Sequence, residues 1–155
     1  MSSPLNSSLN SPLEVGVRVL IVLVEAFPAY LDLNRLALLD YGLLHSADLG
    51  GPESLQPPVP IRVGEFGVKR QRIHNSLQVM IRARLAEMSL ECTGFEFRAS
   101  ENSENFLNLL ESKYVRTLRN RAKWVVREFG NVDDGHLRER MKEICFYWSE
   151  EHELI

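Results

Sequence analysis

The chain has 155 residues, of which 45% are hydrophobic and 25% are charged, and its formal net charge is −3. This length and composition indicate one folded globular domain with a real core and exclude a disordered or fibrous chain. The two cysteines, Cys92 and Cys145, form neither a disulfide framework nor a Cys-x-x-Cys zinc motif, so a reducing cytoplasm is the expected setting.

The charge is distributed unevenly along the chain. Residues 1–60 carry a net charge of −4, residues 61–130 carry +5, and residues 131–155 carry −4. Such asymmetry indicates a nucleic-acid face or an acidic protein partner for the basic middle segment. The N-terminus has no positive charge, and the longest apolar run is far shorter than the ~20 residues of a membrane helix. We therefore expect neither a signal peptide nor a membrane association.

Two helix starts are visible early in the chain. Ser11-Pro12-Leu13-Glu14 combines an N-cap serine, a proline at the first helical position and a glutamate three residues after the cap. It predicts a helix over 12–27 that is apolar nearly all round and therefore central in the core. The β-branched residues of this stretch make a buried strand the alternative. Asp32 is the predicted N-cap of a second helix over 33–45, whose apolar face Asp40 interrupts.

The segment 46–64 holds four prolines and three glycines, which predict a loop. A connection of this length inside a compact domain is often functional. Its proline segment is extended and pre-ordered, so Pro57, Pro58 and Pro60 form a candidate protein-docking loop. A surface insertion without a partner is the alternative.

The next stretch changes its hydrophobic period. Apolar residues at steps of three and four from Ile73 to Leu85 predict a helix. Alternation then predicts two strands on either side of Thr93-Gly94, with Cys92 among the packed positions and Gly94 supplying the positive φ of a tight hairpin. A basic helix that leads straight into a short hairpin is how a winged-helix domain ends. We therefore expect a mainly α, winged-helix-like fold of about five to six helices with one β-hairpin wing.

Three more helices are expected after the hairpin. Ser100 can cap the first, which breaks near 111–113, and the second covers 114–129 with Gly130 as its C-cap. Asp133 or Asp134 can cap the last, which ends near Ser149. The domain organisation is then a flexible tail over 1–10, a winged-helix-like domain over 11–130 containing the 46–64 loop, and a C-terminal helix with an acidic tail over 131–155.

Two sets of basic residues are the candidate face for DNA or for an acidic partner. In a DNA-binding winged helix, the helix before the hairpin enters the major groove and the hairpin contacts the backbone. Glutamates on this hairpin would repel phosphate, and ordinary solvation of the exposed helix faces is the alternative for both sets. The helix–hairpin set is Lys69, Arg70, Arg72, Arg82, Arg84 and Arg98, and the set on the following helix is Arg116, Arg119, Lys123 and Arg127.

No residues have the spacing of a catalytic or metal site. The four histidines, His45, His74, His136 and His152, are scattered and have no recognisable metal-ligand spacing. The sequence contains neither a glycine-rich phosphate loop after a strand nor a Gly-x-Ser-x-Gly turn. We therefore expect no enzymatic activity, no cofactor, no metal and no small-molecule substrate.

Five segments carry a family resemblance: 4–18, 31–52, 60–66, 97–103 and 114–125, the last of which begins Tyr-Val-Arg-Thr-Leu-Arg-Asn-Arg. They resemble the middle-component proteins of bacterial ABC three-component conflict systems, relatives of the Lamassu anti-phage systems. The resemblance implies a small, non-catalytic, winged-helix-like subunit. Such a subunit joins an SMC-like coiled-coil ATPase, similar to chromosome-maintenance or double-strand-break-repair proteins, to a nuclease or other toxic effector. The resemblance identifies no catalytic or binding residues in this chain.

Two functions remain as hypotheses. The first is a cytoplasmic adaptor in a DNA-sensing, ATPase-driven anti-phage defence complex, with DNA contacted only inside the complex if at all. The alternative is a stand-alone winged-helix DNA-binding transcription regulator, which the acidic ends of the chain and the hairpin glutamates disfavour.

Overall fold

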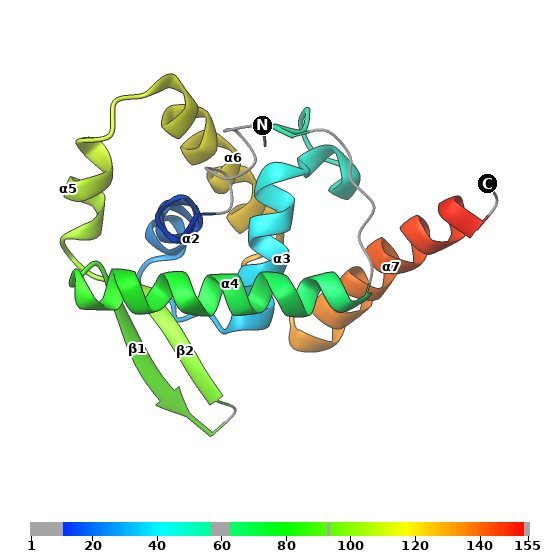
Figure 1. The fold of residues 1–155 in the computed structure, drawn as a ribbon, viewed down its shortest axis with the longest axis horizontal. Helices are drawn as coiled ribbons and strands as arrows, with labels where there is room; N and C mark the ends of the chain where they lie inside the picture. The colour runs from blue at the N-terminus through cyan, green and yellow to red at the C-terminus, as the bar shows by residue number, and fades with distance from the viewer. Residues whose placement is uncertain (1–10, 57–62, 93, 154–155) are drawn as a thin grey trace.

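The computed structural model describes residues 11–56, 63–92 and 94–153. Its described part is mainly helical with one two-stranded antiparallel hairpin, which confirms the predicted mainly α, winged-helix-like class (Figure 1). The elements are α2 (Pro12–Ala26), α3 (Leu33–Leu44), the 3-10 helix η1 (Ser46–Leu49), α4 (Val63–Arg82), β1 (Ala86–Glu91), β2 (Gly94–Ala99), α5 (Ser103–Asn108), α6 (Lys113–Phe129) and α7 (Asp134–Glu153).

The two predicted helix starts are confirmed. The Ser11 hydroxyl accepts a hydrogen bond from the Glu14 backbone N–H at 3.2 Å, and Pro12 occupies the first helical position of α2. Asp32 accepts from the Arg35 N–H at 2.8 Å at the start of α3. Each cap satisfies a backbone donor that the first helical turn leaves unpaired. The strand alternative for the first apolar stretch is therefore wrong.

Other boundaries differ from the prediction. The 46–64 segment contains the short η1 helix, and α4 begins at Val63, so Gly64 and Gly67 are helical. The helix after the hairpin begins at Ser103 and not directly after Ser100, whose hydroxyl accepts from the Asn102 N–H at 3.3 Å. The candidate docking loop Pro57, Pro58 and Pro60 lies outside the described residues. In the part of the chain that is described, no helix has the length and apolar character needed to cross a membrane.

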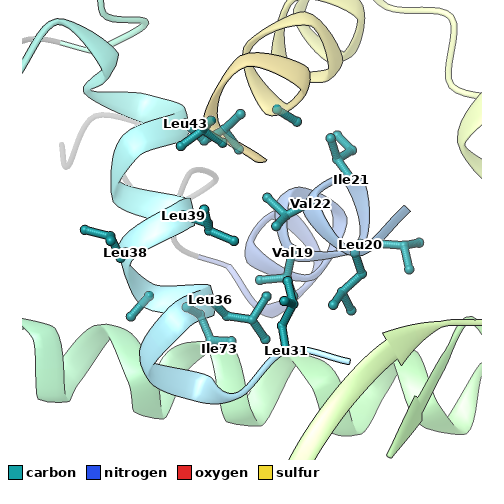
Figure 2. Packing of buried hydrophobic residues seen from close by; sticks show 14 of the residues in the cluster. Val19, Leu20, Ile21, Val22, Leu31, Leu36, Leu38, Leu39, Leu43 and Ile73 are labelled. Atoms are coloured by element: carbon teal, nitrogen blue, oxygen red, sulfur yellow. The ribbon is translucent and has the colours of Figure 1, made fainter. Parts of the chain in front are cut away.

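Helix α2 forms the centre of the molecule. It packs against α3, α4, α5, α6 and β2, and Figure 1 shows it between α4 on one side and α6 on the other. Consecutive residues Val19–Leu23 are buried, so every face of this part of the helix is covered. Figure 2 shows Val19 and Leu20 near Leu31 and Leu36, beside Ile73 of α4. Apolar burial on all sides is what the sequence predicted for this segment.

The hairpin is joined to the rest of the molecule by its second strand. In β1–β2, Met88 is opposite Phe97 and Leu90 is opposite Phe95. Phe97 also exchanges both backbone hydrogen bonds with Leu31, at 2.8 Å each, so Leu31 adds a one-residue bridge on the outer side of β2. Gly94 has a φ of 122°, as predicted for this turn. The resulting order of helix, bridge, two helices and hairpin is that of a winged-helix domain.

One hairpin prediction is wrong. Cys92 was expected to pack, but it is exposed. The hairpin extends past the helices that cover its base (Figure 1), so its alternating pattern continues where no core lies behind it. Neighbouring positions at the base, Ala86 and Ala99, are buried.

Candidate interaction surfaces

A buried charge network occupies the space between α2, α3 and α4. Arg18 Nε donates to Asp40 Oδ1 at 2.9 Å, and Lys69 Nζ donates to Asp40 Oδ2 at 2.6 Å. Arg18 and Asp40 are almost fully buried. The Asp40 that interrupts the apolar face of α3 is thus paired from two neighbouring helices. Lys69, which the sequence placed in the first basic set, is directed to this interior carboxylate.

The remaining members of the first set are dispersed. Arg72 and Arg82 are exposed on α4, Arg70 is half-buried, and Arg84 lies in the turn after α4 with a φ of 62°. Arg98 on β2 pairs with Glu87 of β1 at 2.6 Å, and its guanidinium lies 4.6 Å from the centre of the Tyr30 ring. A cation that is held by a carboxylate and an aromatic ring has fewer donors left for phosphate.

Helix α6 carries a more uniform basic surface, which we call the α6 stripe. The helix has six basic residues and one acidic residue. Leu118, Ala122 and Val125 form its buried side. The α6 stripe consists of the predicted residues Arg116, Arg119, Lys123 and Arg127.

Three members of the α6 stripe are open to solvent. Arg116 and Lys123 are exposed and have no ion pair with any described residue. Arg127 is exposed and lies 3.6 Å from the carboxylate of the adjacent Glu128. Arg119 is half-buried, donates to the Asn108 side chain at 2.8 Å and lies 3.9 Å from the Glu104 carboxylate. Through Arg116 and Lys123, which have no ion pair with any described residue, the stripe presents positive charge that a partner can neutralise.

The two predicted basic sets do not form one face. Helices α4 and α6 each pack against both α2 and α3, and Figure 1 shows them on opposite sides of α2. A flat partner that covers the α6 stripe leaves Arg72 and Arg82 of α4 uncovered. The basic middle segment that the charge totals revealed is thus two separate surfaces in three dimensions.

The start of the 46–64 segment is packed onto α6. A Cβ placed on Gly51 would lie 2.2 Å from Trp124 Cζ2, so the backbone of this residue rests directly on the indole ring. Arg121 Nε donates to the Glu53 carbonyl at 3.1 Å. These contacts fix the described part of the segment beside the α6 stripe.

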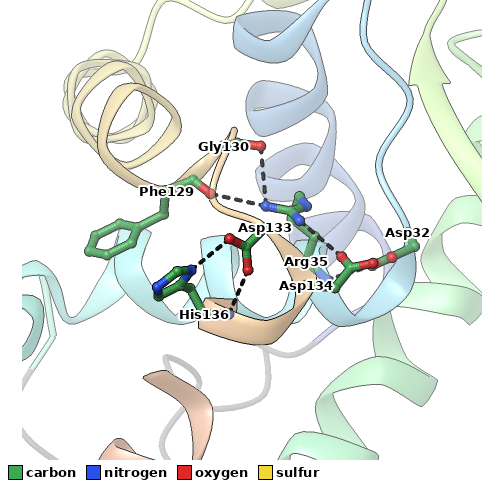
Figure 3. Close-up of polar contacts among 7 residues, drawn as sticks. All are labelled: Asp32, Arg35, Phe129, Gly130, Asp133, Asp134 and His136. Atoms are coloured by element: carbon green, nitrogen blue, oxygen red, sulfur yellow. Dashed lines mark hydrogen bonds and ion pairs between the residues drawn. The ribbon is translucent and has the colours of Figure 1, made fainter. Parts of the chain in front are cut away.

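The end of α6 is joined to α3 and α7 by Arg35 (Figure 3). Its guanidinium donates to the Phe129 and Gly130 carbonyls at 3.3 Å each and to Asp134 at 3.1 Å. Gly130 is the C-cap as predicted, with a φ of −63°, which is not left-handed. Arg35 therefore supplies donors to the carbonyls at the end of α6, which have no partner within the helix.

The first turn of α7 contains an exposed acid–base pair (Figure 3). Asp133 accepts from the His136 N–H at 2.9 Å and lies 2.6 Å from the His136 ring Nδ1. The hydrogen bond to this carboxylate raises the pKa of His136, and the hydrogen bonds from His136 lower the pKa of Asp133. Asp133 is thus the N-cap of the last helix, one of the two residues that the sequence proposed.

Three apolar side chains on the hairpin are exposed. Met88, Leu90 and Phe95 have exposed fractions of 48%, 70% and 49%. The sequence shows their alternation but not their exposure, because the pattern of a single strand does not reveal where the covering helices end. Their exposure makes the hairpin face a candidate interaction surface in addition to the α6 stripe.

A search for metal ligands found no group of three His, Cys, Asp or Glu placed to hold a metal ion among the residues whose side chains the structure describes. The hollow at the base of the hairpin, of about 440 Å³, has Arg84, Glu87, Arg98 and Glu101 among its lining residues. Glu87 and Arg98 pair with each other across its wall.

These features define a small, mainly helical, winged-helix-like chain whose candidate sites are charged and apolar surfaces. The chain belongs to the family described as ABC-three component (ABC-3C) system Middle Component 2, whose model matches residues 8–151. Searches of curated proteins and of solved structures gave no match. The family match makes this chain a component of a multi-subunit system with protein partners, in agreement with the sequence resemblance.

Proposed function

We propose that this chain is a non-catalytic adaptor that joins an SMC-like coiled-coil ATPase to a nuclease-type effector in a cytoplasmic, DNA-sensing, anti-phage complex. The α6 stripe is the observation that carries the proposal. Arg116 and Lys123 project positive charge that no described residue of the chain neutralises. In the proposed complex, an acidic surface of the ATPase or of the effector covers this stripe.

Charge reversal on the two basic surfaces tests this function. The α6 variant combines Arg116→Glu, Lys123→Glu and Arg127→Glu, and the control combines Arg72→Glu and Arg82→Glu on α4. We expect the α6 variant to recover about tenfold less ATPase and effector from the native host at physiological salt with nuclease, and to lose protection against phage. The α4 control should retain both, and circular dichroism should show that both variants are folded.

Two results would contradict the adaptor proposal. If the wild-type chain is recovered without an ATPase or an effector, these proteins are not its partners. If the α6 variant recovers as much ATPase and effector as the wild-type chain, the α6 stripe is not the docking surface.

A stand-alone DNA-binding regulator is the second candidate, and the exposure of Arg72 and Arg82 on the helix before the wing favours it. It predicts that the isolated protein shifts duplex DNA, with an affinity that falls steeply as salt rises. Under this hypothesis the α4 variant, and not the α6 variant, should abolish the shift. The internal contacts of Lys69 and Arg98 support the adaptor instead, because they reduce the free cations on the winged-helix side.

A further inference from the structure

The apolar face of the hairpin continues beyond the core. Residues directly opposite each other in an antiparallel pair lie on the same face, so Met88, Phe97, Leu90 and Phe95 share one face. Phe97 is fully buried at the base, whereas Leu90 and Phe95 are exposed toward the turn. The same row of side chains is therefore half covered by the core and half open to solvent.

The outer edge of β1 also has free backbone groups. Phe97 directs its N–H and C=O toward Leu31, and its partner across the hairpin is Met88. Because Phe97 directs its backbone groups away from β1, Met88 and Phe97 form a non-hydrogen-bonded pair. Such pairs alternate with hydrogen-bonded pairs along an antiparallel ladder, so Leu90 and Phe95 also form a non-hydrogen-bonded pair. Met88 and Leu90 therefore direct their N–H and C=O groups away from β2. No described strand pairs with this side of β1.

Met88 and Leu90 thus combine two features that an extended peptide recognises. Their side chains are open on the apolar face, and their backbone groups are open at the strand edge. Addition of a strand at such an edge gives hydrogen bonds from the main chain and specificity from alternate side chains. An unpaired edge beside exposed apolar side chains is otherwise an aggregation hazard.

The opposite face of the hairpin is acidic. Glu87 is neutralised by Arg98, but Glu91 and Glu96 have no cationic partner among the described residues. We propose that β1 binds an extended segment of another subunit of the same complex, with apolar side chains on the Leu90 face alternating with Lys or Arg on the Glu91 face. The inference rests on the adaptor function and identifies a second docking surface, separate from the α6 stripe.

Charge argues against a second copy of this chain as the occupant. Antiparallel pairing of two β1 strands centred on Ser89 would place Glu87 of each copy beside Glu91 of the other. Like charges directly opposite each other are destabilising in a sheet. A basic segment meets the same edge without that repulsion.

Amide hydrogen exchange tests the edge directly. The complex purified with the wild-type chain is exposed to deuterium, quenched and dissociated, and the amides of this chain are read residue by residue. We expect Met88 and Leu90 to exchange about tenfold or more slowly in the complex than in the isolated protein. Ser89, whose N–H faces β2, should change much less.

Variants separate the backbone contribution from the side-chain contribution. Met88→Pro removes an outward N–H while leaving the hydrogen bonds between β1 and β2, since proline is tolerated at a free edge. The double variant Leu90→Ser and Phe95→Ser removes the open apolar face. Both should reduce complex recovery about tenfold or more, whereas the control Leu109→Ser, at a residue 77% exposed outside the hairpin, should not.

The outcomes distinguish the two proposals. If no complex forms with the wild-type chain, the adaptor function and this inference both fail. If the complex forms but the Met88 and Leu90 amides stay unprotected, only the strand addition is wrong. If the isolated chain self-associates and Leu90→Ser abolishes that association, the occupant is a second copy and the proposed basic segment is wrong.

Discussion

At the scale of single residues, the Asp40 carboxylate shows how one interior charge depends on its partners. Burial by itself would raise the pKa of Asp40, but the adjacent Lys69 and Arg18 hold it well below its ordinary value. The carboxylate therefore stays ionised inside the protein. Desolvation makes such a network a weak source of net stability, but removal of the shared carboxylate takes the Asp40 partner from both Arg18 and Lys69.

Asp40→Asn is expected to be strongly destabilising for this reason. The amide keeps the size of the side chain but removes the negative charge that the buried Arg18 and the partly buried Lys69 share. The free energy of unfolding, measured by urea denaturation at neutral pH, should fall by about 3–5 kcal/mol. The control Glu87→Gln breaks the exposed pair with Arg98 and should cost less than about 1 kcal/mol. Equal losses of unfolding free energy in the two variants would show that burial does not increase the cost of breaking the Asp40 network.

Residue-scale features were predictable where they depend on neighbours in the sequence. The N-caps Ser11 and Asp32 act on backbone groups three residues away, so the local pattern is sufficient to find them. Lys69 was assigned to a basic surface because its partner, Asp40, lies on another helix. Only the packing of α4 against α3 brings the two together.

At the scale of elements, the contact between Gly51 and Trp124 determines how the 46–64 segment begins its path over α6. Gly51→Ala would place a methyl group 2.2 Å from a rigid indole carbon, so the backbone or the ring must move. We expect a loss of about 1–3 kcal/mol in unfolding free energy, the usual cost of overpacking. Thermal or urea denaturation measures it.

Gly16→Ala provides the matched control for this prediction. A Cβ on Gly16 would lie 2.5 Å from Met80 Cε, which is as crowded but is the end of a flexible side chain. Met80 can change rotamer, and alanine improves helix propensity by about 1 kcal/mol. This variant should therefore be close to neutral. A larger loss for Gly16→Ala than for Gly51→Ala would contradict the distinction between rigid and flexible neighbours.

The alternation of apolar residues predicted the hairpin but not which of its side chains are exposed. The alternation around Gly94 and the positive φ of that residue are local properties, and both are present. Whether Leu90 is covered depends on how far the helices reach along the strand, which the sequence of the strand does not contain. The same limitation explains why Cys92 was placed in the core although it is exposed.

At the scale of the whole molecule, the charge totals predicted a basic middle segment but not its division. Two helices that are close in sequence, α4 and α6, pack on opposite sides of α2 (Figure 1). Their basic residues therefore face different surroundings and can meet different partners. The proposed adaptor needs at least two separate surfaces, and the α6 stripe and the β1 edge are the two candidates.

Folding stability should depend on pH through two histidines of opposite effect. Burial lowers the pKa of His45, so His45 stabilises the fold above its unfolded pKa of about 6.5, and this contribution is lost as pH falls through the folded pKa. The hydrogen bond to Asp133 raises the pKa of the exposed His136. Its contribution is present below the unfolded pKa and is lost as pH rises through the folded pKa.

Replacing each histidine separately should reveal the two slopes. Between about pH 7.5 and about pH 5, the urea midpoint of His136→Gln should fall more steeply than that of wild type, because only the buried histidine then opposes protonation. The midpoint of His45→Gln should fall less than wild type or rise slightly, since His136 binds its proton more tightly in the folded state. Parallel curves for wild type and His45→Gln would mean that His45 is protonated inside the fold without cost. In that case the negative charges of Asp48 and Asp40, which favour the protonated ring, would compensate for burial and for the positive charge of Lys69.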